Sequence, residues 1–543
     1  MSVLQPTDAP RTPPASGSRI AALPPRVRHS AVWAAALTAL LLGLLWAGTL
    51  AKVTGDLAAQ WAWADFAARH PGSAYDLGWY GGMYPASYSV VAPYLMAWFG
   101  VRTVAVAAGT ASAALLALLL VRSRVRRPLP VALWGAFALS CDVAAGRVTF
   151  ALGLMFGLAA VVVGGTERNA GRRRTAGAAA LALLATLASP VAGLFVEVAA
   201  AALLFTGRRG TGLALAVPPP LVILLTTLLF PFAGVDPITV PTVVFSGGCA
   251  VAVALLVPKD WRALRVGSAV YALGILLTWS FSTPIGSNVQ RLALIFGGVA
   301  ALAALLARPA VPRGRTLALL AAFAATAYWT VTANVIGMPA PSAGGQAAGL
   351  VSELRQLNAD TGRLEAVPMV NHWESWGLLD SAELARGWNR QLDVQRNPLF
   401  YHGTLTADAY QVWLRTWAVR YVALPDATPD VAGRSEAALI HTRPSWLREV
   451  WHDPNWTLYR FTGAVPLADA PAVVDLADAA QVVLTVPAPG RLTVRVSWSP
   501  WLSVRGPAGA CLSQDGGWIR LNAPGAGTYR IAAGYTWPRG TPC

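Results

Sequence analysis

The chain has 543 residues, of which 55% are hydrophobic and only 13% are charged, and its mean hydropathy is +0.49. A soluble domain carries about 25% charged residues, so this composition excludes an ordinary soluble protein. The net charge of +16 does not indicate nucleic-acid binding, because the basic residues form short clusters between apolar segments instead of a basic face on a folded domain. The clusters span residues 122–127, 168–174, 208–209, 259–265 and 308–315.

The basic clusters predict the topology, since Lys and Arg gather in cytoplasmic loops. Residues 1–30 are rich in Pro and Ser and lack the cleavage site of a signal peptide, so we expect a disordered cytoplasmic tail. Residues 31–337 then form a transmembrane region of about eleven helices. The predicted helices and hairpins cover residues 31–52, 102–121, 128–165, 175–207, 210–258, 266–307 and 316–337. The helix count around 175–207 stays open because Ser189 and Pro190 interrupt that segment.

Residues 338–543 follow the last apolar segment, and the predicted topology places them outside the cell. Residues 338–465 alternate helical and strand patterns, which predicts an α/β domain. Residues 466–543 alternate short β-runs with Gly/Pro turns, as is typical of a β-sandwich. Cys511 and Cys543 lie in this external part, where an oxidising environment favours a disulfide between them. The predicted fold class is therefore a polytopic α-helical membrane protein with a C-terminal extracytoplasmic α/β plus β-sandwich region.

Several ionisable and amide side chains share the predicted external side, although only the basic clusters were used to assign it. Ionisable groups near spanning segments tend to line a cavity or to pair with one another. Arg147 and Arg291 each open an apolar segment, so they either snorkel to the interface or hold an anion such as a phosphate. Asp236, in "GVDP", is interpreted as a turn residue. The whole group is Asp56, Asp65, Asp76, Asp142, Arg147, Asp236, Asn288 and Arg291.

The first external loop, residues 53–88, contains three of these carboxylates. Asp56 stands just beyond the first helix, where a general base for chemistry at the membrane surface would lie, but it can equally cap the helical segment that follows. Asp65 comes nine residues later, so the two carboxylates point to opposite faces of one continuous helix. Asp76 is expected in a turn, and the glycines of "WYGGMYP" are expected to allow a close backbone approach.

These pieces together resemble the GT-C superfamily of membrane glycosyltransferases. Within it, the chain is similar to bacterial membrane proteins labelled 6-pyruvoyl-tetrahydropterin synthase-related, a label that does not describe their chemistry. The resemblance implies an enzyme of the bacterial plasma membrane that transfers a sugar, with inversion, from a polyprenyl-phosphate donor to a glycan, lipid or protein acceptor on the outer face. The matching stretches are "GDLAAQWAWADF", "WYGGMYPASYSVVAPYL", "AGRVTFALGL", "SPVAGLF", "PIGSNVQRL" and "WLRTWAVRYVALP".

Carried onto this sequence, the resemblance implies that Asp56 is the catalytic base and Asp65 a second acidic residue of the loop. The residues implied in substrate binding are Arg291 and Arg147 for the donor phosphate, Tyr80, Tyr84 and Tyr88 for the groove, and Asn288, to which no particular part of the substrate is assigned. The chain has no adjacent Asp-Asp or Asp-Glu pair of the kind that several GT-C families use, so dependence on a divalent cation such as Mg²⁺, Mn²⁺ or Ca²⁺ stays open.

Two other classes of function remain as alternatives. A multi-pass transporter or flippase of envelope precursors would commonly show internal repeats, and no repeat relates the two halves of this chain. A non-catalytic scaffold for envelope assembly would use the external region as a binding module, and it predicts that Asp56 is dispensable.

Overall fold

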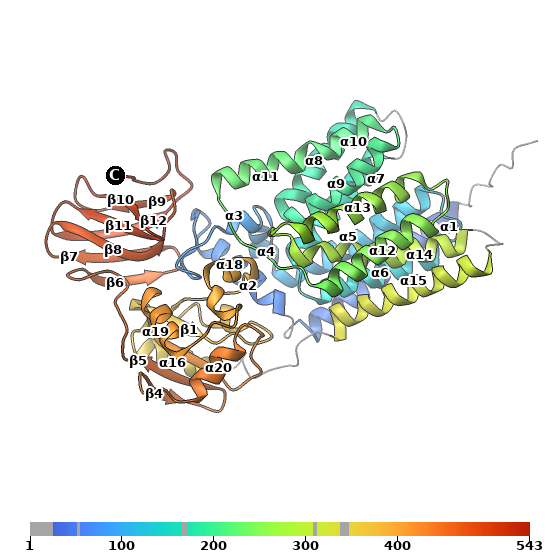
Figure 1. Ribbon diagram of the computed structural model, residues 1–543. Coiled ribbons are helices and arrows are strands. Elements are labelled where there is room, and N and C mark those ends of the chain that lie inside the picture. The colour runs from blue at the N-terminus through green and yellow to red at the C-terminus, as the bar shows by residue number, and fades with distance from the viewer. Residues whose placement is uncertain (1–24, 52–54, 166–170, 308–311, 337–346) are drawn as a thin grey trace, which may run out of the picture.

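The computed structural model describes residues 25–51, 55–165, 171–307, 312–336 and 347–543. A bundle of apolar helices forms one end of the molecule, and two β-containing units form the other (Figure 1). The helices of the bundle are α1 (Pro25–Gly48), α5 (Val101–Arg122), α6 (Pro128–Ala144), α7 (Val148–Gly164), α8 (Arg172–Ala188), α9 (Pro190–Phe205), α10 (Arg209–Ala216), α11 (Pro218–Leu229), α12 (Val240–Leu256), α13 (Arg262–Ser280), α14 (Arg291–Ala307) and α15 (Arg313–Val331), with the short turns η1 (Gly286–Gln290) and η2 (Thr332–Ile336).

Within the described ranges, six helical spans are long and apolar enough to cross a membrane, and four shorter apolar helices accompany them. Leucine side chains on the outer faces of these helices, such as Leu41, Leu44 and Leu224, are exposed, as lipid-facing positions require. The predicted multi-pass helical region is therefore confirmed. The six spans are Ser30–Gly48, Val101–Arg122, Arg209–Leu229, Arg262–Ser280, Gly286–Ala307 and Arg313–Ile336.

The interrupted segment at 175–207 forms two separate helices. Ser189 lies between α8 and α9, and its side chain accepts a hydrogen bond from the Ala192 backbone N–H. Pro190 occupies the first position of α9, where a missing N–H costs nothing. A Cβ at Gly153 of α7 would lie 2.8 Å from the Ala192 Cβ, so glycine allows α7 and α9 to approach closely.

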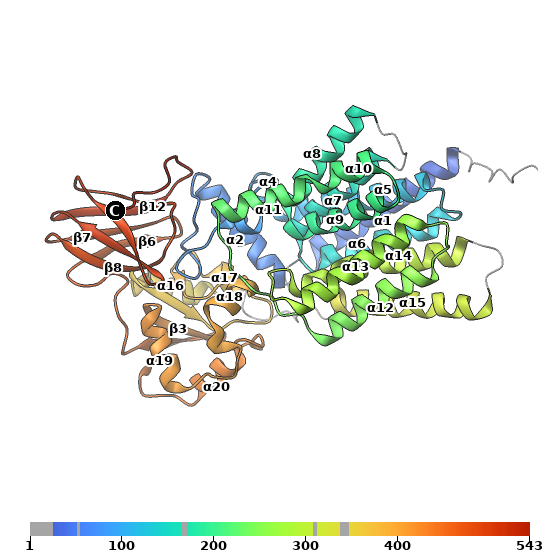
Figure 2. The same ribbon diagram turned by 45° about the horizontal axis from the view of Figure 1, so that its top comes forward.

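The segment between α1 and α5 forms α2 (Gly55–Arg69), α3 (Pro85–Tyr88) and α4 (Ala92–Phe99). Ala58, Ala62 and Trp63 of α2 pack into the core of the α/β unit, and Tyr75 and Leu77 pack into the core of the β-sandwich. This segment therefore lies between the bundle and both C-terminal units (Figure 2).

The α/β unit is built on a five-stranded mixed sheet with the strand order β2-β1-β3-β5-β4. Strands β1, β2 and β3 are parallel, whereas β5 is antiparallel to both β3 and β4. The strands are β1 (Arg363–Ala366), β2 (Glu383–Leu384), β3 (Val419–Pro425), β4 (Leu447–His452) and β5 (Trp456–Phe461). The helices are α16 (Ala348–Gln356), α17 (Glu374–Gly377), α18 (Arg390–Arg396), α19 (Ala407–Thr416) and α20 (Arg434–His441), with the short turns η4 (Ala359–Thr361) and η5 (Pro398–Phe400).

The last unit consists of two antiparallel sheets, ordered β6-β7-β12-β9 and β10-β11-β8, whose apolar side chains share one core. The predicted α/β and β-sheet architecture of the C-terminal region is thus confirmed. Cys511 and Cys543 are joined by a disulfide, with 4.9 Å between their Cα atoms. The strands are β6 (Val473–Asp478), β7 (Gln481–Val486), β8 (Gly490–Ser497), β9 (Leu502–Arg505), β10 (Cys511–Asp515), β11 (Trp518–Ala523) and β12 (Gly527–Ala533).

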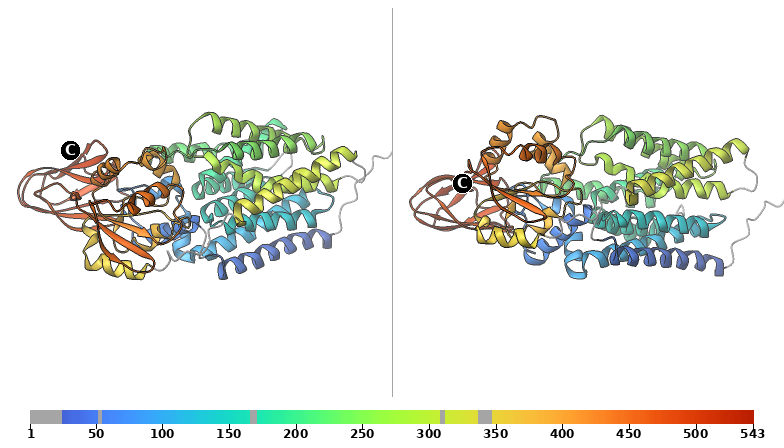
Figure 3. Two further views of the ribbon diagram at one scale, coloured as in Figure 1. Left: turned by 60° about the horizontal axis from the view of Figure 1, so that its bottom comes forward. Right: turned by 90° about the horizontal axis from the view of Figure 1, so that it is seen from below.

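Backbone contacts of residues 79–83 fasten the first loop to both C-terminal units. Arg396 donates hydrogen bonds of 2.7 Å to the carbonyl oxygens of Tyr80 and Gly82, and the Ser497 N–H donates to the Gly81 carbonyl at 2.7 Å. Gly82 has φ +129°, and a Cβ there would collide with the Tyr75 ring, so this approach requires glycine. Both units lie beyond one end of the bundle in two further views (Figure 3).

Candidate functional site

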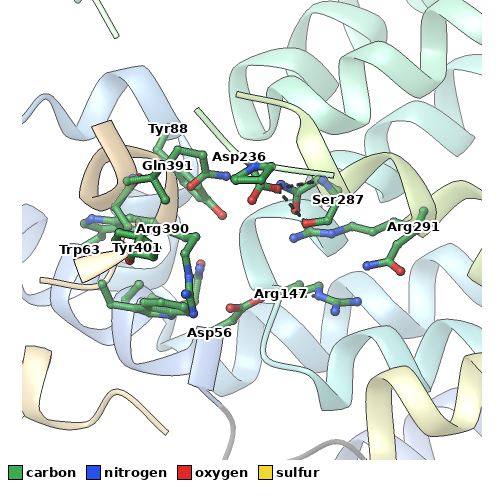
Figure 4. A pocket seen from close by; sticks show the side chains of 18 residues that line it. Asp56, Trp63, Tyr88, Arg147, Asp236, Ser287, Arg291, Arg390, Gln391 and Tyr401 are labelled. Carbon is green, nitrogen blue, oxygen red and sulfur yellow. Dashed lines mark hydrogen bonds and ion pairs between the residues drawn. The ribbon is translucent and has the colours of Figure 1, made fainter. Parts of the chain in front are cut away.

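A cavity of about 450 Å³ lies where the bundle, the first loop and the α/β unit meet. Arg147 and Arg291 lie on one side of it and Arg390 and Tyr401 on the other, with Asp56 between them (Figure 4). The lining residues are Asp56, Ala59, Gln60, Trp63, Tyr88, Arg147, Asp236, Pro237, Ser287, Asn288, Gln290, Arg291, Trp388, Asn389, Arg390, Gln391, Val394 and Tyr401.

Asp56 lies in the first turn of α2, and its carboxylate faces the cavity. Its Oδ2 atom is 3.5 Å from Nε of Arg147, and 37% of its side chain remains exposed. Among the described residues, no hydrogen bond to this carboxylate is found. Asp56 therefore keeps an accessible oxygen that can accept a proton or a hydrogen bond from a bound molecule.

Arg147 immediately precedes α7 and joins several elements of the bundle. Its Nη1 atom lies 3.0 Å from Oδ1 of Asp142 on α6 and 2.7 Å from Oδ1 of Asn334 in η2. The guanidinium is thus oriented by fixed partners on one side and by Asp56 on the cavity side. An arginine held in this way presents its remaining donors in a defined direction.

Arg291 opens α14 and is only 8% exposed. Its guanidinium lies 5.0 Å from the centre of the Phe150 ring, and among the described residues it has neither a carboxylate nor a hydrogen-bond partner. Burying an unpaired charge is costly, and a cation–π contact offsets only part of that cost. A buried guanidinium that borders a cavity without a partner can accommodate an anion there.

Asp236 lies in the loop before α12 and forms part of the cavity wall, which is more than the turn position expected from the sequence. Its Oδ2 atom accepts hydrogen bonds from the Ser287 backbone N–H at 3.0 Å, the Ser287 hydroxyl at 2.8 Å and the Asn288 amide at 3.3 Å. Burial raises the pKa of the Asp236 carboxyl, although the hydrogen bonds from Ser287 oppose this shift. Asn288 is therefore held against Asp236 at the edge of the cavity.

The α/β unit supplies the opposite wall, through residues that no pattern in the sequence singles out. Arg390 forms an ion pair of 3.0 Å with Asp430, and its guanidinium lies over the rings of Trp388 (5.2 Å) and Tyr401 (5.8 Å). Trp388 in turn stacks on His372, with 3.3 Å between ring centroids. Arg390 is thus held rigidly where it borders the cavity. Nothing in the sequence pairs a residue of α18 with Asp56, because only the docking of this unit brings them together.

Three of the residues that the family resemblance implied as catalytic or substrate-binding, Asp65, Tyr80 and Tyr84, lie outside the cavity wall. Asp65 accepts a hydrogen bond of 2.6 Å from the Trp376 indole, on the other face of α2. The Tyr80 hydroxyl donates to the Gly387 carbonyl at 2.7 Å, and the Tyr84 hydroxyl bonds to Ser499 at 2.9 Å, so both rings fasten the first loop to the C-terminal units. Tyr88, by contrast, lines the cavity and lies 4.3 Å from the Trp63 ring.

The donor set of the cavity does not form a recognisable metal site. In the part of the chain that the structure describes, no three His, Cys, Asp or Glu side chains come close enough together to hold an ion. The two carboxylates of the cavity wall face other partners, since Asp56 pairs with Arg147 and Asp236 accepts from Ser287 and Asn288.

Fold and site together define a multi-pass membrane protein with a cation-lined cavity at the end of its helical bundle. Residues 469–543, the β-sandwich, match the model of a family described as a domain of unknown function, DUF8823. No curated protein matches the chain.

The solved structures that are similar to it include an oligosaccharyltransferase and an arabinofuranosyltransferase. The oligosaccharyltransferase of Archaeoglobus fulgidus, solved with a tethered acceptor peptide, aligns with a TM-score of 0.44 and 13% identity over 73% of this chain and 69% of that one. The arabinofuranosyltransferase AftD from Mycobacteria aligns with a TM-score of 0.42 and 14% identity over 94% of this chain and 60% of that one. These TM-scores lie below 0.5, so the similarity is a distant likeness of fold and does not bear on the reaction.

Proposed function

We propose that the protein is a membrane glycosyltransferase that transfers a sugar, with inversion, from a polyprenyl-phosphate donor to a cell-envelope glycan, lipid or protein acceptor on the outer face of a bacterial plasma membrane. The observation that carries the proposal is Arg291, a buried guanidinium that borders the cavity and has no anionic partner among the described residues. In the proposed complex, the phosphate of the donor is the anionic partner of the Arg291 guanidinium. The narrower resemblance, to proteins labelled 6-pyruvoyl-tetrahydropterin synthase-related, stays a prediction.

The proposed reaction uses the two kinds of charge on the bundle side of the cavity. The donor phosphate binds to Arg291 and Arg147, and the Asp56 carboxylate accepts the proton of an acceptor hydroxyl. The acceptor oxygen then forms a bond to the anomeric carbon while the bond from that carbon to the phosphate oxygen breaks. The electron pair of that bond stays on the phosphate, which leaves as polyprenyl phosphate and is stabilised by the arginines. Attack from the face opposite the phosphate inverts the anomeric configuration.

The position of the cavity supports a lipid-linked donor. It lies at the end of an apolar bundle whose outer leucines need lipid, so a phosphate head group at the membrane surface reaches Arg291 while its hydrocarbon tail stays in the bilayer. On the other side, the α/β unit closes the cavity with Arg390, Gln391 and Tyr401. An acceptor that approaches from water meets this polar wall first.

The test compares two aspartates of the same helix. Asp56→Asn removes the proposed base, and Asp65→Asn is the matched control, because Asp65 points to Trp376 and away from the cavity. Both variants are assayed in membranes for transfer from a range of polyprenyl-phosphate sugars. We expect Asp56→Asn to lower kcat about 10²- to 10⁴-fold, as is usual when a general base is lost, and Asp65→Asn to change it little.

Two outcomes would contradict the proposal. Equal rates of sugar transfer by the wild type and by Asp56→Asn would show that Asp56 is not the general base. Absence of transfer by the wild type with every donor would favour the transporter or the scaffold.

The proposed side of the membrane is tested by a reporter fused after residue 337, since a cytoplasmic reporter would overturn the assigned orientation.

A further inference from the structure

The β-sandwich is attached to the end of α11 by aromatic contacts. The Trp501 indole N–H donates a hydrogen bond of 2.8 Å to the carbonyl of Leu229, the last residue of α11. The Trp501 ring stacks on Phe230 with 5.4 Å between centroids and an interplanar angle of 14°. Tyr535, just beyond β12, contacts both rings edge-on. The end of α11 and the adjacent edge of the β-sandwich lie side by side in two views (Figures 1 and 2).

The helix at this contact is lipid-facing up to its last turn. α11 belongs to the span Arg209–Leu229, and its side chains Leu224, Leu225 and Leu228 are all exposed. Because such a row of leucines needs a hydrocarbon surrounding, the apolar part of the bilayer extends close to the end of α11. The β-sandwich residues that touch this end therefore stand at the depth of the lipid head groups.

A second group of aromatic side chains, on α4 and after β12, is exposed and lies beside the contact of Trp501, Phe230 and Tyr535. Trp98 is 73% exposed, and Phe99 is also exposed, at the end of α4, a helix too short to cross a membrane. Tyr94 of α4 is adjacent to Trp98 and donates a hydrogen bond of 3.2 Å to the Pro71 carbonyl. The Tyr535 N–H donates to the neighbouring Gly72 carbonyl at 3.2 Å, so α4 and the segment after β12 meet at the same turn. Trp537, in the same segment as Tyr535, is 79% exposed, so the exposed aromatic side chains here form a group and are not scattered singly.

A basic side chain completes this surface. The Arg539 guanidinium lies 5.6 Å from the Trp501 ring and 5.7 Å from the Trp537 ring, and among the described residues it has no carboxylate partner. Trp and Tyr concentrate at membrane interfaces, where one end of the ring is apolar and the other is hydrated. An arginine beside them can bind a lipid phosphate.

We propose that an aromatic patch, formed by Tyr94, Trp98, Phe99, Tyr535 and Trp537, lies in the head-group region of the bilayer and seats the β-sandwich on the membrane surface. The partner is the lipid surface itself. This inference does not depend on the proposed reaction, since it follows from the contacts of α4, α11 and the segment after β12. It assigns a membrane-contact role to the family-matched residues 469–543, through their last segment.

The experiment is photo-crosslinking of the full chain in nanodiscs of phosphatidylcholine and phosphatidylglycerol. The photoreactive residue p-benzoyl-phenylalanine is placed in turn at positions 537 and 98, and lipid adducts are measured by mass spectrometry. Val412, an exposed apolar side chain on α19, is the control position, because it lies on the α/β unit away from the patch. Trp537 is so exposed that its replacement should not disturb folding, and position 535 provides a second site if expression fails.

We expect lipid adducts at position 537 in a yield similar to that at position 98, and only background at position 412. The proposal is overturned if position 98 gives lipid adducts while 537 and 535 give none. It is also overturned if 537 reacts with lipid no more than 412 does, or if it crosslinks to protein instead of lipid.

Discussion

Replacing Arg291 tests whether this arginine binds a ligand or stabilises the folded protein. In Arg291→Met the buried charge is lost but the length and the apolar contact with Phe150 are largely kept. Removing an unpaired buried cation relieves a desolvation penalty of several kcal/mol, whereas the cation–π contact that is lost contributes about 2 kcal/mol. We therefore expect the ligand-free variant to be more stable than the wild type, by about 1–3 kcal/mol.

The same substitution should weaken the binding of a phosphate. A hydrogen bond to a charged group contributes about 1.5–3 kcal/mol, which corresponds to a roughly 10- to 150-fold loss of affinity. The assay is thermal unfolding in nanodiscs, followed by intrinsic fluorescence, at increasing concentrations of a polyprenyl monophosphate. Binding raises the unfolding temperature of the wild type as its ligand sites fill, and a weaker site requires proportionally more ligand.

Arg102→Met is the matched control. Arg102 of α5 is half-buried, donates to the Ala47 carbonyl at 3.3 Å and does not line the cavity. Its loss should lower the unfolding temperature and leave the effect of the ligand unchanged. The reasoning is refuted if Arg291→Met unfolds below the wild type and polyprenyl phosphate stabilises both proteins equally, because Arg291 would then be a structural residue.

Three further changes test other parts of the structure. Burial raises the pKa of Asp76 to about 7, so between pH 4 and 7 the folded state holds a proton that the unfolded state has lost, and the unfolding free energy falls as pH rises, by about 1.4 kcal/mol per pH unit. Asp76→Asn should flatten this dependence in thermal melts at pH 5 and pH 7.5, and an unchanged slope would contradict the assignment. Cys511→Ser opens a loop closed over 32 residues and should destabilise the β-sandwich by about 3–4 kcal/mol, measured by chemical denaturation; a loss below about 1 kcal/mol would refute this. Arg390→Gln should raise KM roughly tenfold and change kcat less, since in the proposed function Arg390 contacts the acceptor and takes no part in the reaction; a fall confined to kcat would be inconsistent with that role.

The general architecture could be predicted from sequence because it depends on composition and periodicity. Apolar segments and basic clusters mark the bundle, and alternating patterns mark the sheets. The basic clusters also placed Asp56, Arg147 and Arg291 on one side of the membrane, and the structure brings these three into one cavity. Helical spacing separated Asp65 from Asp56, and in the structure Asp65 faces Trp376.

The rest of the cavity could not be predicted, because it depends on how separate units dock. Arg390 and Trp388 line the cavity only because the α/β unit folds back onto α2. Tyr80 and Tyr84, which the family resemblance implied would line a groove, instead use their hydroxyl groups to join the first loop to the C-terminal units. Asp236 looked like a turn residue, since its partners Ser287 and Asn288 are remote in sequence.

The shared cores of the first loop and the C-terminal units have a consequence for biogenesis. Trp63, Tyr75 and Tyr84 emerge from the ribosome early, but the strands that bury them are encoded after residue 346. Translation proceeds at about 5–20 residues per second, so roughly 15–90 s pass before those strands, which lie between residues 363 and 533, are made. During that interval the aromatic side chains of the first loop are exposed. We expect chaperones on the far side of the membrane, or the bilayer surface, to cover them until the C-terminal units fold against the loop.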